Sequence, residues 1–432
     1  MNQNLYIGFD LGTTNIKAVL VDDSLSVLSA TKREMNYIEP ESGYKETNPE
    51  ILMESIFDIL KEFTSLVKNK TKIKAICFSG ATGNTMLLDE ANKPLTNIIS
   101  WLDTRPVKSL FSVDEVYPVT GWPAVEIFPL AHLSWWKENA KEIYEKAQRI
   151  VMNNDFITFR LTGNFALDYS TATTSHLYNQ LDKCWHKPFL DKLEIKEEQL
   201  SKLLPTGTPI GNLTKFAAEQ TGLSEDVIVI SGAFDHPTAA RAVGVKEEGD
   251  LLLSCGTSWV GFFPIIDRKE ALKLKVLIDP YLSDETGHWG AIFSLPKLGI
   301  KIDNWINKLA ENYEIPEKEK FDFFNREAGK SKLSDNSLII NIEDEPTNGI
   351  FKTNSAADVA RTIMESVARK LKDEIDKINT GGITTKNISM VGGPTNSNIW
   401  IKTISKITGL KINLGDGEYT GAIGAAKIAK IK

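Results

Sequence analysis

The 432-residue sequence predicts an α/β protein made of two similar halves. Short apolar runs alternate with stretches of helical apolar spacing, which is typical of mixed strand and helix architecture. Residues 5–21 are predicted to form a strand, a Gly-Thr-Thr turn and a second strand, and residues 250–266 repeat this plan with a Gly-Thr-Ser turn. The repeat predicts two domains of related design, residues 1–246 and 247–432.

The first half is expected to begin as a β-meander and to continue with alternating strands and helices. Its apolar, β-rich runs end at turn residues, and helical apolar spacing follows Asn48-Pro49. The expected strands are 5–9, 16–21, a third from residue 25, 73–78 and 227–230. The expected helices are 49–68 and one that Asp235 caps, with Pro237 in its first turn.

The second half is expected to repeat this pattern around one stretch that the sequence leaves unassigned. Apolar residues recur at every fourth position between 356 and 378, which predicts a long helix. The other expected elements are strands at 250–254, 259–266 and 388–391 and helices from 399 and at 421–431. Residues 267–349 mix charged and aromatic segments and give no clear prediction.

Composition narrows the classes of function. Lys and Arg number 50 against 57 Asp and Glu, so the net charge is −7, and basic residues form no long block. Nucleic-acid binding is not expected, because the sequence has no cluster of basic residues to contact the phosphate backbone. No run approaches the roughly 18 apolar residues of a membrane span, so no membrane association is expected. Three widely spaced cysteines predict a reducing, cytoplasmic location.

The two turns of the repeat are candidate phosphate-binding sites. Backbone N–H groups and hydroxyls at a tight glycine turn can cradle phosphate oxygens, and an aspartate at the strand end can hold a metal through water. The candidate residues are Gly12, Thr13 and Thr14 with Asp10 in the first half, and Gly256, Thr257 and Ser258 in the second. The alternative is an ordinary β-turn in which the aspartate bonds backbone donors.

Asp235 is the candidate catalytic base. Phosphoryl transfer to a hydroxyl needs a carboxylate that takes the proton, and Asp235 lies in a glycine-containing loop near the domain boundary. The alternative is a helix-capping aspartate. A helix N-terminus is expected to lower the pKa of this carboxyl, which a loose transition state tolerates because the proton leaves late.

Two further motifs suggest ligand contacts. SWLDTR, residues 100–105, offers Trp101 for carbon atoms and Asp103 with Arg105 for hydroxyls, or else a core tryptophan beside a surface ion pair. VGGPTNSN, residues 391–398, offers two glycines for close backbone approach and Asn396 or Ser397 for a base or ribose, or else a plain strand-to-helix loop.

The order of these motifs resembles the FGGY carbohydrate kinases of the actin-like, sugar kinase and Hsp70-like ATPase superfamily. The segments that carry the resemblance are IGFDLGTTNIKAVLVD (7–22), SGATGNTMLLDE (79–90), ISWLDTR (99–105), DFITFRLTGNFALDYSTA (155–172), ISGAFDHPTAARAVGV (230–245), SCGTSW (254–259) and VGGPTNSNIW (391–400). The resemblance implies two ribonuclease-H-like domains around a central cleft, with the sugar held mainly by the first and ATP by the second, which is shortened at its C-terminus.

The resemblance also implies roles for individual residues. Asp235 matches the family's base, and Asp10 and Asp235 lie where Mg²⁺ is expected. The implied ATP-binding residues are Gly12, Thr13, Thr14, Gly256, Thr257, Ser258, Gly392, Gly393 and Asn396. The implied acceptor-binding residues are Thr82, Gly83, Trp101, Asp103 and His236.

The chain departs from the family pattern at three places, of which the first two predict a different substrate or pose and the third concerns the nucleotide contacts. Xylulokinase-like members usually have GQMHG where this chain has GATGN, so Thr82 and Gly83 replace a Met and a His. His236 stands where Asn is common after the base, and Pro394 replaces a glycine of the adenosine loop.

The sequence therefore predicts an ATP- and Mg²⁺-dependent kinase that phosphorylates a hydroxyl of a small ketose, sugar acid or polyol, acting in the cytoplasm, with a homodimer as its expected assembly. A catalytically impaired sugar- or nucleotide-sensing module on the same fold is the main alternative. An Hsp70-like chaperone ATPase is the second, and it would need a peptide-binding extension.

Overall fold

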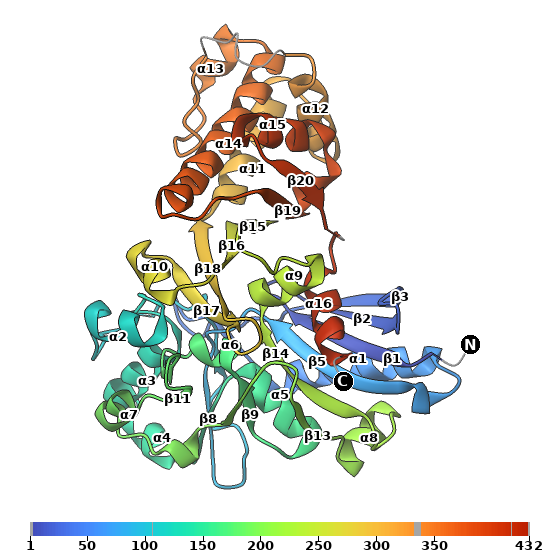
Figure 1. Ribbon diagram of the computed structural model, residues 1–432, viewed down its shortest axis with the longest axis vertical. Helices are drawn as coiled ribbons and strands as arrows, with labels where there is room; N and C mark the ends of the chain where they lie inside the picture. The colour runs from blue at the N-terminus through green and yellow to red at the C-terminus, as the bar shows by residue number, and fades with distance from the viewer. Residues whose placement is uncertain (1–2, 106, 332–337, 416, 431–432) are drawn as a thin grey trace. The chain divides into compact units, whose positions relative to one another are not determined.

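The computed structural model describes residues 3–105, 107–331, 338–415 and 417–430 (Figure 1). The chain forms two compact units. The first contains the described residues up to Gly244, together with Val276–Gly290 and the residues from Tyr419 onward. The second contains Val245–Lys275 and Ala291–Glu418. The change of unit after Gly244 lies near the expected boundary, whereas the return of two later segments to the first unit has no signal in the sequence.

The first unit is built on a six-stranded sheet in the order β13-β14-β5-β1-β2-β3. Its strands are β1 (Leu5–Leu11), β2 (Asn15–Asp22), β3 (Val27–Glu34), β5 (Ile73–Gly80), β13 (Pro209–Asn212) and β14 (Ile228–Phe234). β1, β5 and β14 run parallel, so their carboxyl ends meet at one edge. This edge brings together Asp10, which lies opposite Ser79, and Phe234, which lies opposite Gly80.

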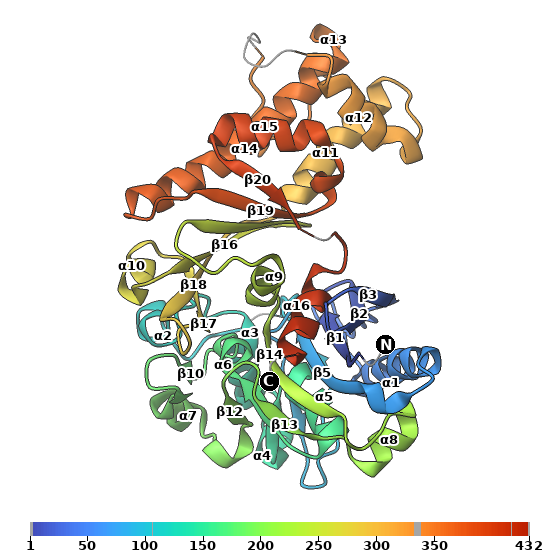
Figure 2. The ribbon, with the colours of Figure 1, turned by 45° about the vertical axis from the view of Figure 1, so that its right-hand side comes forward.

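Two layers of helices cover the sheet. α1 (Pro49–Leu66), α5 (Asn153–Thr162) and α8 (Lys215–Thr221) supply apolar side chains to the core on one face. α1 begins at Pro49 because the Asn48 side chain accepts hydrogen bonds from two backbone N–H groups of the first turn. On the other face α16 (Thr420–Ala429) packs on the sheet beside α9 (Asp235–Val243), as Figures 1 and 2 show.

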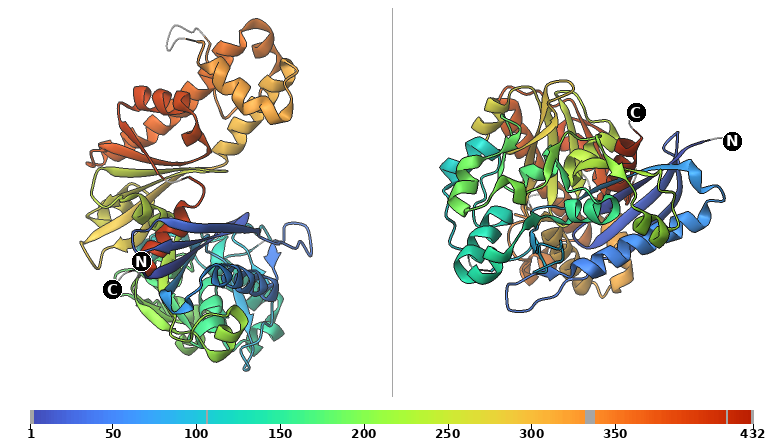
Figure 3. Two further views of the ribbon diagram at one scale, coloured as in Figure 1. Left: turned by 90° about the vertical axis from the view of Figure 1, so that its right-hand side faces the viewer. Right: turned by 90° about the horizontal axis from the view of Figure 1, so that it is seen from below.

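A close backbone contact fixes α16 against β1 (Figure 3). A Cβ added at Gly8 would lie 2.0 Å from the carbonyl oxygen of Ala422 and 2.4 Å from the nitrogen of Ala426. Gly424 makes the same kind of contact, because a Cβ there would lie 2.2 Å from the carbonyl oxygen of Thr238 in α9. Small residues at these positions let the last helix lie directly on β1, the strand that carries Asp10.

A second core of the first unit lies within residues 87–203. Its helices are α2 (Val113–Thr120), α3 (Phe128–Asn139), α4 (Lys141–Lys146), α6 (Tyr169–Thr173) and α7 (Lys187–Leu193). α6 begins where the Asp168 carboxylate accepts a 2.7 Å hydrogen bond from the Thr171 backbone N–H. Short strand pairs complete this region, including β9 (Ala166–Asp168) with β12 (Lys202–Leu204).

The second unit repeats the strand plan of the first. β15 (Asp250–Cys255) and β16 (Trp259–Ile265) form an antiparallel hairpin, and β19 (Asn387–Gly392) runs parallel to β15. This matches the β1–β2 hairpin with β5 parallel to β1. β20 (Lys411–Leu414) extends the sheet beside β19. The expected duplication is therefore confirmed at the level of strand pairing.

The stretch that the sequence left unassigned forms regular structure in both units. It contains α10 (Arg268–Lys273), β17 (Leu277–Leu282), β18 (His288–Leu295), α11 (Leu298–Asn312), α12 (Lys320–Ala328) and α13 (Asn348–Thr353). The long helix α14 (Ala356–Thr380) and α15 (Asn398–Thr408) follow, and α14 packs against α11, α12 and α15. None of the described helices is long and apolar enough to cross a membrane.

Several expected boundaries differ from the structure: β14, for example, runs to Phe234, beyond the end expected at residue 230, and two other differences have a clear local cause. The third strand begins at Val27, because Leu25 adopts a φ of 63° in a turn whose N–H donates to the Asp22 carbonyl at 2.9 Å. The residue that caps α9 is Phe234, and Asp235 is the first helical residue. Asp235 is therefore not a helix cap in the sense expected from the sequence.

We expect Gly8→Ala to destabilise the first unit by about 3 kcal/mol, because the added methyl group meets backbone atoms of α16 that cannot rotate away. Calorimetric unfolding measures the effect. Gly349→Ala is the matched control, since no heavy atom lies within 4 Å of an added Cβ there. Equal unfolding temperatures for the two variants would contradict the close packing of α16 on β1.

Candidate active site

Asp10 lies at the carboxyl end of β1 in a crowded, partly buried position. A Cβ at Gly421, in the first turn of α16, would lie 2.5 Å from its Oδ2. Burial, and after it the negative charge of Asp235, raise the pKa of the Asp10 carboxyl to about 7, although Lys17, opposite Asp10 on β2, acts to lower it. The two carboxylates thus lie close enough to repel each other, as expected of groups that share a cation or a proton.

Asp235 begins α9 with its side chain 30% exposed, so solvent and ligands can reach it. Its Oδ1 accepts a 2.6 Å hydrogen bond from the backbone N–H of His236, and the His236 Nε2 lies 3.7 Å from the same oxygen. Burial raises the pKa of this carboxyl, and His236 opposes the shift. The lowered pKa expected from the helix N-terminus is wrong, because the cost of burying the charge exceeds the benefit of the helix dipole. A raised pKa makes Asp235 a better proton acceptor.

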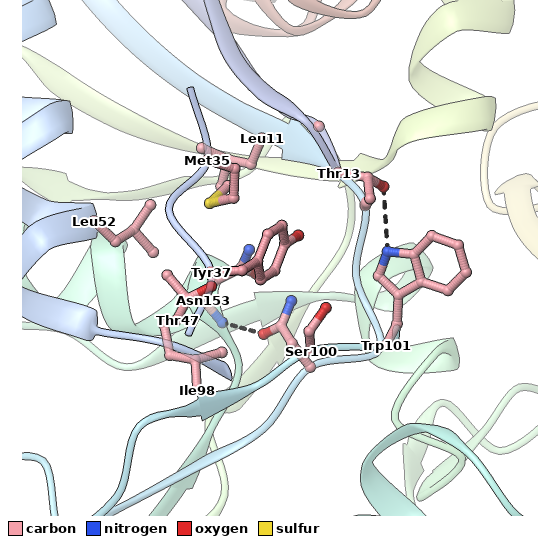
Figure 4. A pocket seen from close by; sticks show the side chains of 13 residues that line it. Leu11, Thr13, Met35, Tyr37, Thr47, Leu52, Ile98, Ser100, Trp101 and Asn153 are labelled. Carbon is pink, nitrogen blue, oxygen red and sulfur yellow. Dashed lines mark hydrogen bonds between the residues drawn. The ribbon is translucent and has the colours of Figure 1, made fainter. Parts of the chain in front are cut away.

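The Gly12–Thr14 turn joins β1 to β2 beside a small pocket. The Gly12 N–H donates to the Asn15 carbonyl at 3.0 Å, which closes the turn, and the Trp101 Nε1 donates to the Thr13 Oγ1 at 3.3 Å (Figure 4). The pocket beside them has a volume of about 30 Å³, and its lining includes Tyr37 and Asn153. Trp101 is 36% exposed and forms part of the rim. The Gly12–Thr14 turn and Trp101, which belong to two separate sequence motifs, are therefore in contact. The spacing of the motifs in the sequence could not predict this contact.

Several buried polar side chains near this edge have no hydrogen-bond partner among the described residues. They are the hydroxyls of Ser79 and Thr82 and the amide oxygens of Asn153 and Asn154. Ser79 lies in β5 opposite Asp10, and the Asn153 N–H donates to the Asn84 Oδ1 at 2.7 Å. Buried polar atoms usually have partners, and ligand hydroxyls could supply them here. Of these four, only Thr82 was identified from the sequence.

Gly83 is covered by the ring of Phe128. A Cβ at Gly83 would lie 2.1 Å from the Phe128 Cδ1, and Gly83 has a φ of 80°, so no larger residue fits there. Phe128 itself has a φ of 70°, an unfavourable value for an aromatic residue, and its ring packs edge-on to Trp122 and His176. Gly83 therefore offers a ligand no side chain, and an aromatic ring fills the space beside it.

Asp103 is not available to a ligand. Its Oδ1 accepts from the Arg105 Nε and its Oδ2 from the Arg105 Nη2, each at 2.8 Å, and the Lys45 backbone N–H donates to Oδ2 at 2.7 Å. Arg105 also pairs with Glu46 at 2.7 Å, and its side chain is 3% exposed. Asp103 and Arg105 therefore form a buried ion pair, and the expected surface ion pair is wrong. Asp103 supports the loop that carries Trp101.

The second unit contains a pocket of about 530 Å³ at the carboxyl ends of β15 and β19. The Trp400 ring contacts those of Trp259 and Phe324 in its wall, and these buried rings make that wall apolar. Polar groups on the same wall are the Gly256–Thr257 turn, Asp303, Asn325, Asn396 and Ser397.

Glycines shape the Gly256–Ser258 turn of this pocket. Gly392 has a φ of 102°, and a Cβ there would lie 2.3 Å from the Cys255 carbonyl oxygen, so β19 and β15 end in direct backbone contact. Gly299 approaches the Gly256 carbonyl oxygen equally closely, at 2.1 Å for an added Cβ. The Ser258 hydroxyl accepts from the Lys297 N–H at 3.0 Å, so it supports the turn from within.

The two related units, each with a hairpin, a glycine turn and a parallel strand, define a protein of the actin-like ATPase fold. Comparison with known sequences identifies the family. Residues 5–242 match the N-terminal domain of the FGGY family of carbohydrate kinases, and residues 251–432 match its C-terminal domain. The chain belongs to this family and is an ATP-dependent sugar kinase.

The relatives agree over nearly the whole chain. A xylulose kinase from Staphylococcus epidermidis is 26% identical over 99% of this chain and 88% of its own length. One from Bacillus subtilis is 25% identical over 98% of this chain and 87% of its own.

Solved structures share the fold. A xylulose kinase from Rhodospirillum rubrum has a TM-score of 0.87 at 20% identity, covering 99% of this chain and 90% of that one. A gluconate kinase from Lactobacillus acidophilus has a TM-score of 0.85 at 21% identity, covering 99% and 89%.

We expect Asp10→Asn to stabilise the metal-free protein as the pH rises. The folded state keeps the Asp10 carboxyl protonated up to about pH 7, whereas the unfolded state ionises near its ordinary pKa of 3.8, so wild-type stability falls over this interval. The uncharged variant has no such loss. Its unfolding temperature in EDTA should exceed that of the wild type by about 2–5 °C at about pH 8, with the difference shrinking toward pH 4. A variant less stable than the wild type at pH 8 would contradict a costly buried charge.

We expect Gly393→Leu to weaken ATP binding about tenfold or more without unfolding the protein. No heavy atom lies within 4 Å of a Cβ added at Gly393, so the new side chain extends into open space at the wall of the second-unit pocket. Titration calorimetry with ATP measures the change, and Gly349→Leu, in similarly open surroundings, is the control. Equal affinity in Gly393→Leu and wild type would place the nucleotide elsewhere.

Proposed function

We propose that the protein transfers the γ-phosphoryl group of ATP to a hydroxyl of a small ketose, sugar acid or polyol, with Asp235 as the base. The observation that carries this proposal is the edge of the first sheet, where a reachable carboxylate of raised pKa lies at the end of β14 and unpartnered buried hydroxyl and amide groups lie around the end of β5. Carboxylate and polar groups of this kind suit a ligand with several hydroxyls. The names of the relatives support xylulose-like or gluconate-like acceptors.

In this proposal the acceptor lies against Trp101, with Thr82, Asn153 and Asn154 bonding its hydroxyls and His236 beside the reacting one. Asp235 accepts a hydrogen bond from that hydroxyl, orients its oxygen for in-line attack, and takes the proton as the new P–O bond forms. Asp103 and Gly83 act through Arg105 and Phe128 and do not contact the acceptor themselves.

ATP is proposed to bind in the second-unit pocket. The adenine lies in this pocket, whose wall is backed by the buried rings of Trp259, Trp400 and Phe324, and Asn396 contacts the nucleoside. The Gly256–Ser258 turn and Gly392–Gly393 approach the phosphates of ATP, and the Gly12–Thr14 turn is proposed to contact the transferred group.

Mg²⁺ fits the carboxylates of Asp10 and Asp235. The negative charge of Asp235 disfavours the ionised form of Asp10, so a cation between them would be stabilising. Mg²⁺ prefers oxygen ligands such as carboxylates, phosphates and water. The ion would neutralise charge on the phosphates of ATP. Asp10 would hold it, and Asp235 would adjoin it.

The proposal includes a cytoplasmic location, which the free thiols of Cys77, Cys184 and Cys255 support, and a homodimer. It includes neither nucleic acid nor membrane as a partner.

The test is ADP release with Mg·ATP over a panel of ketoses, sugar acids and polyols. We expect one acceptor class to stimulate the wild type and Asp235→Asn to lower kcat by about 1000-fold or more while ATP still binds. Asp58→Asn, on the exposed surface of α1, is the control. A variant at position 235 that keeps a tenth of wild-type turnover would overturn the assignment of the base. ATP binding without stimulation by any acceptor would favour a sensing module.

A further inference from the structure

A buried chain of hydrogen bonds ends at the backbone N–H of Phe234, the residue immediately before Asp235. The Ser170 Oγ, in α6, donates to the Asp279 Oδ2 at 2.6 Å and accepts from the Phe234 backbone N–H at 3.1 Å. Ser170 is 2% exposed and Asp279 is fully buried. The members of this chain are far apart in sequence, and none of them belongs to the residues assigned to acceptor, nucleotide or metal.

The direction of these hydrogen bonds is fixed by the donors available. A serine hydroxyl has one hydrogen, and the carboxylate of Asp279 takes it, so the oxygen of Ser170 is left to accept from Phe234. The other oxygen of Asp279 accepts from the Tyr281 backbone N–H at 2.7 Å. In a site without water such hydrogen bonds are strong, and replacing either side chain leaves a buried group unpaired.

The strand that carries Asp279 also holds the far end of α9. The Arg241 Nη2 donates to the Tyr281 carbonyl at 2.8 Å, and its guanidinium lies 4.9 Å from the centre of the Tyr281 ring. The Ile278 carbonyl accepts from the Trp122 Nε1 and from the Gln180 Nε2, which ties β17 to the second core of the first unit. β17 thus holds α9 at its first and last turns.

We propose that Ser170 and Asp279 are positioning residues that fix the carboxylate of Asp235. This inference rests on the proposed role of Asp235 as the base. Phe234 caps α9 without any side-chain hydrogen bond of its own, so the bond from its N–H to Ser170 fixes the backbone of the residue that precedes Asp235. Catalytic groups must keep their positions to within about half an ångström, and a buried carboxylate supplies a rigid anchor.

The experiment compares Ser170→Ala, which removes the acceptor of the Phe234 N–H, with Ser170→Thr, which keeps the hydroxyl. Ser175→Ala is the matched control, since Ser175 is also buried, donates to the Ala172 carbonyl at 2.6 Å and accepts from the Leu177 N–H at 3.0 Å, but does not contact the Asp235 segment. Asp279→Asn replaces Ser170→Ala if the latter does not fold. Two quantities are measured: hydrogen exchange of the amides in residues 228–236, and the steady-state kinetics of phosphoryl transfer.

We expect Ser170→Ala to speed exchange at the Phe234 amide about tenfold and to lower kcat about 10- to 100-fold, with the KM of the acceptor within about threefold of wild type. Ser170→Thr should restore both quantities, and Ser175→Ala should change neither. Unchanged exchange, or faster exchange with unchanged kcat, would overturn the positioning role. The exchange measurement needs no turnover, so a wild type that transfers no phosphoryl group would refute the proposed function and leave the exchange result to decide whether Ser170 holds Phe234.

Discussion

The direct contact between the last helix and the first strand is the constraint on which the site depends. Gly8 leaves no room between β1 and the backbone of α16, and the same approach places Gly421 against the Asp10 carboxylate. A chain segment from beyond residue 418 thereby completes the unit that the first residues begin. The burial that this packing causes raises the pKa of Asp10 to about 7. The packing of α16 therefore controls the pKa of Asp10, since any change that moves α16 away from β1 also exposes the Asp10 carboxylate to water.

The two carboxylates at this edge differ in their surroundings and so in their expected roles. Asp10 faces Lys17 and the helix end, where a charge is costly unless a cation offsets it. Asp235 remains partly exposed and accepts a hydrogen bond from the His236 N–H, so it can meet a ligand hydroxyl. The surroundings of the two carboxylates differ in the same way. Ser170, itself bonded to Asp279, holds the backbone N–H of Phe234 next to Asp235, whereas Gly421 crowds the carboxylate of Asp10.

The sequence predicted the strands, the turns and the family because these depend on local patterns: apolar runs, glycine turns and motif order. It did not predict the assignment of residues 276–290 and of the last helix to the first unit, because such packing depends on contacts across hundreds of residues. Asp103 was misjudged for the same reason, since the Lys45 backbone N–H that donates to its carboxylate is distant in sequence. Ser170 lies in a segment that carries the family resemblance, but the sequence assigned no role to it or to Asn153 and Asn154, which are distinguished by their burial and by missing or shared hydrogen bonds. The sequence showed that Gly83 has no side chain where relatives have one, but it could not show that the ring of Phe128 occupies the space beside it.

The most direct test of the account follows the fate of the γ-phosphoryl group. With labelled ATP and an acceptor that stimulates ADP release, phosphorus NMR and mass spectrometry count sugar phosphate and inorganic phosphate against ADP. The account predicts one phosphorylated acceptor for each ADP and almost no inorganic phosphate. Equal amounts of ADP and inorganic phosphate, unaffected by the acceptor, would contradict it and identify a hydrolase.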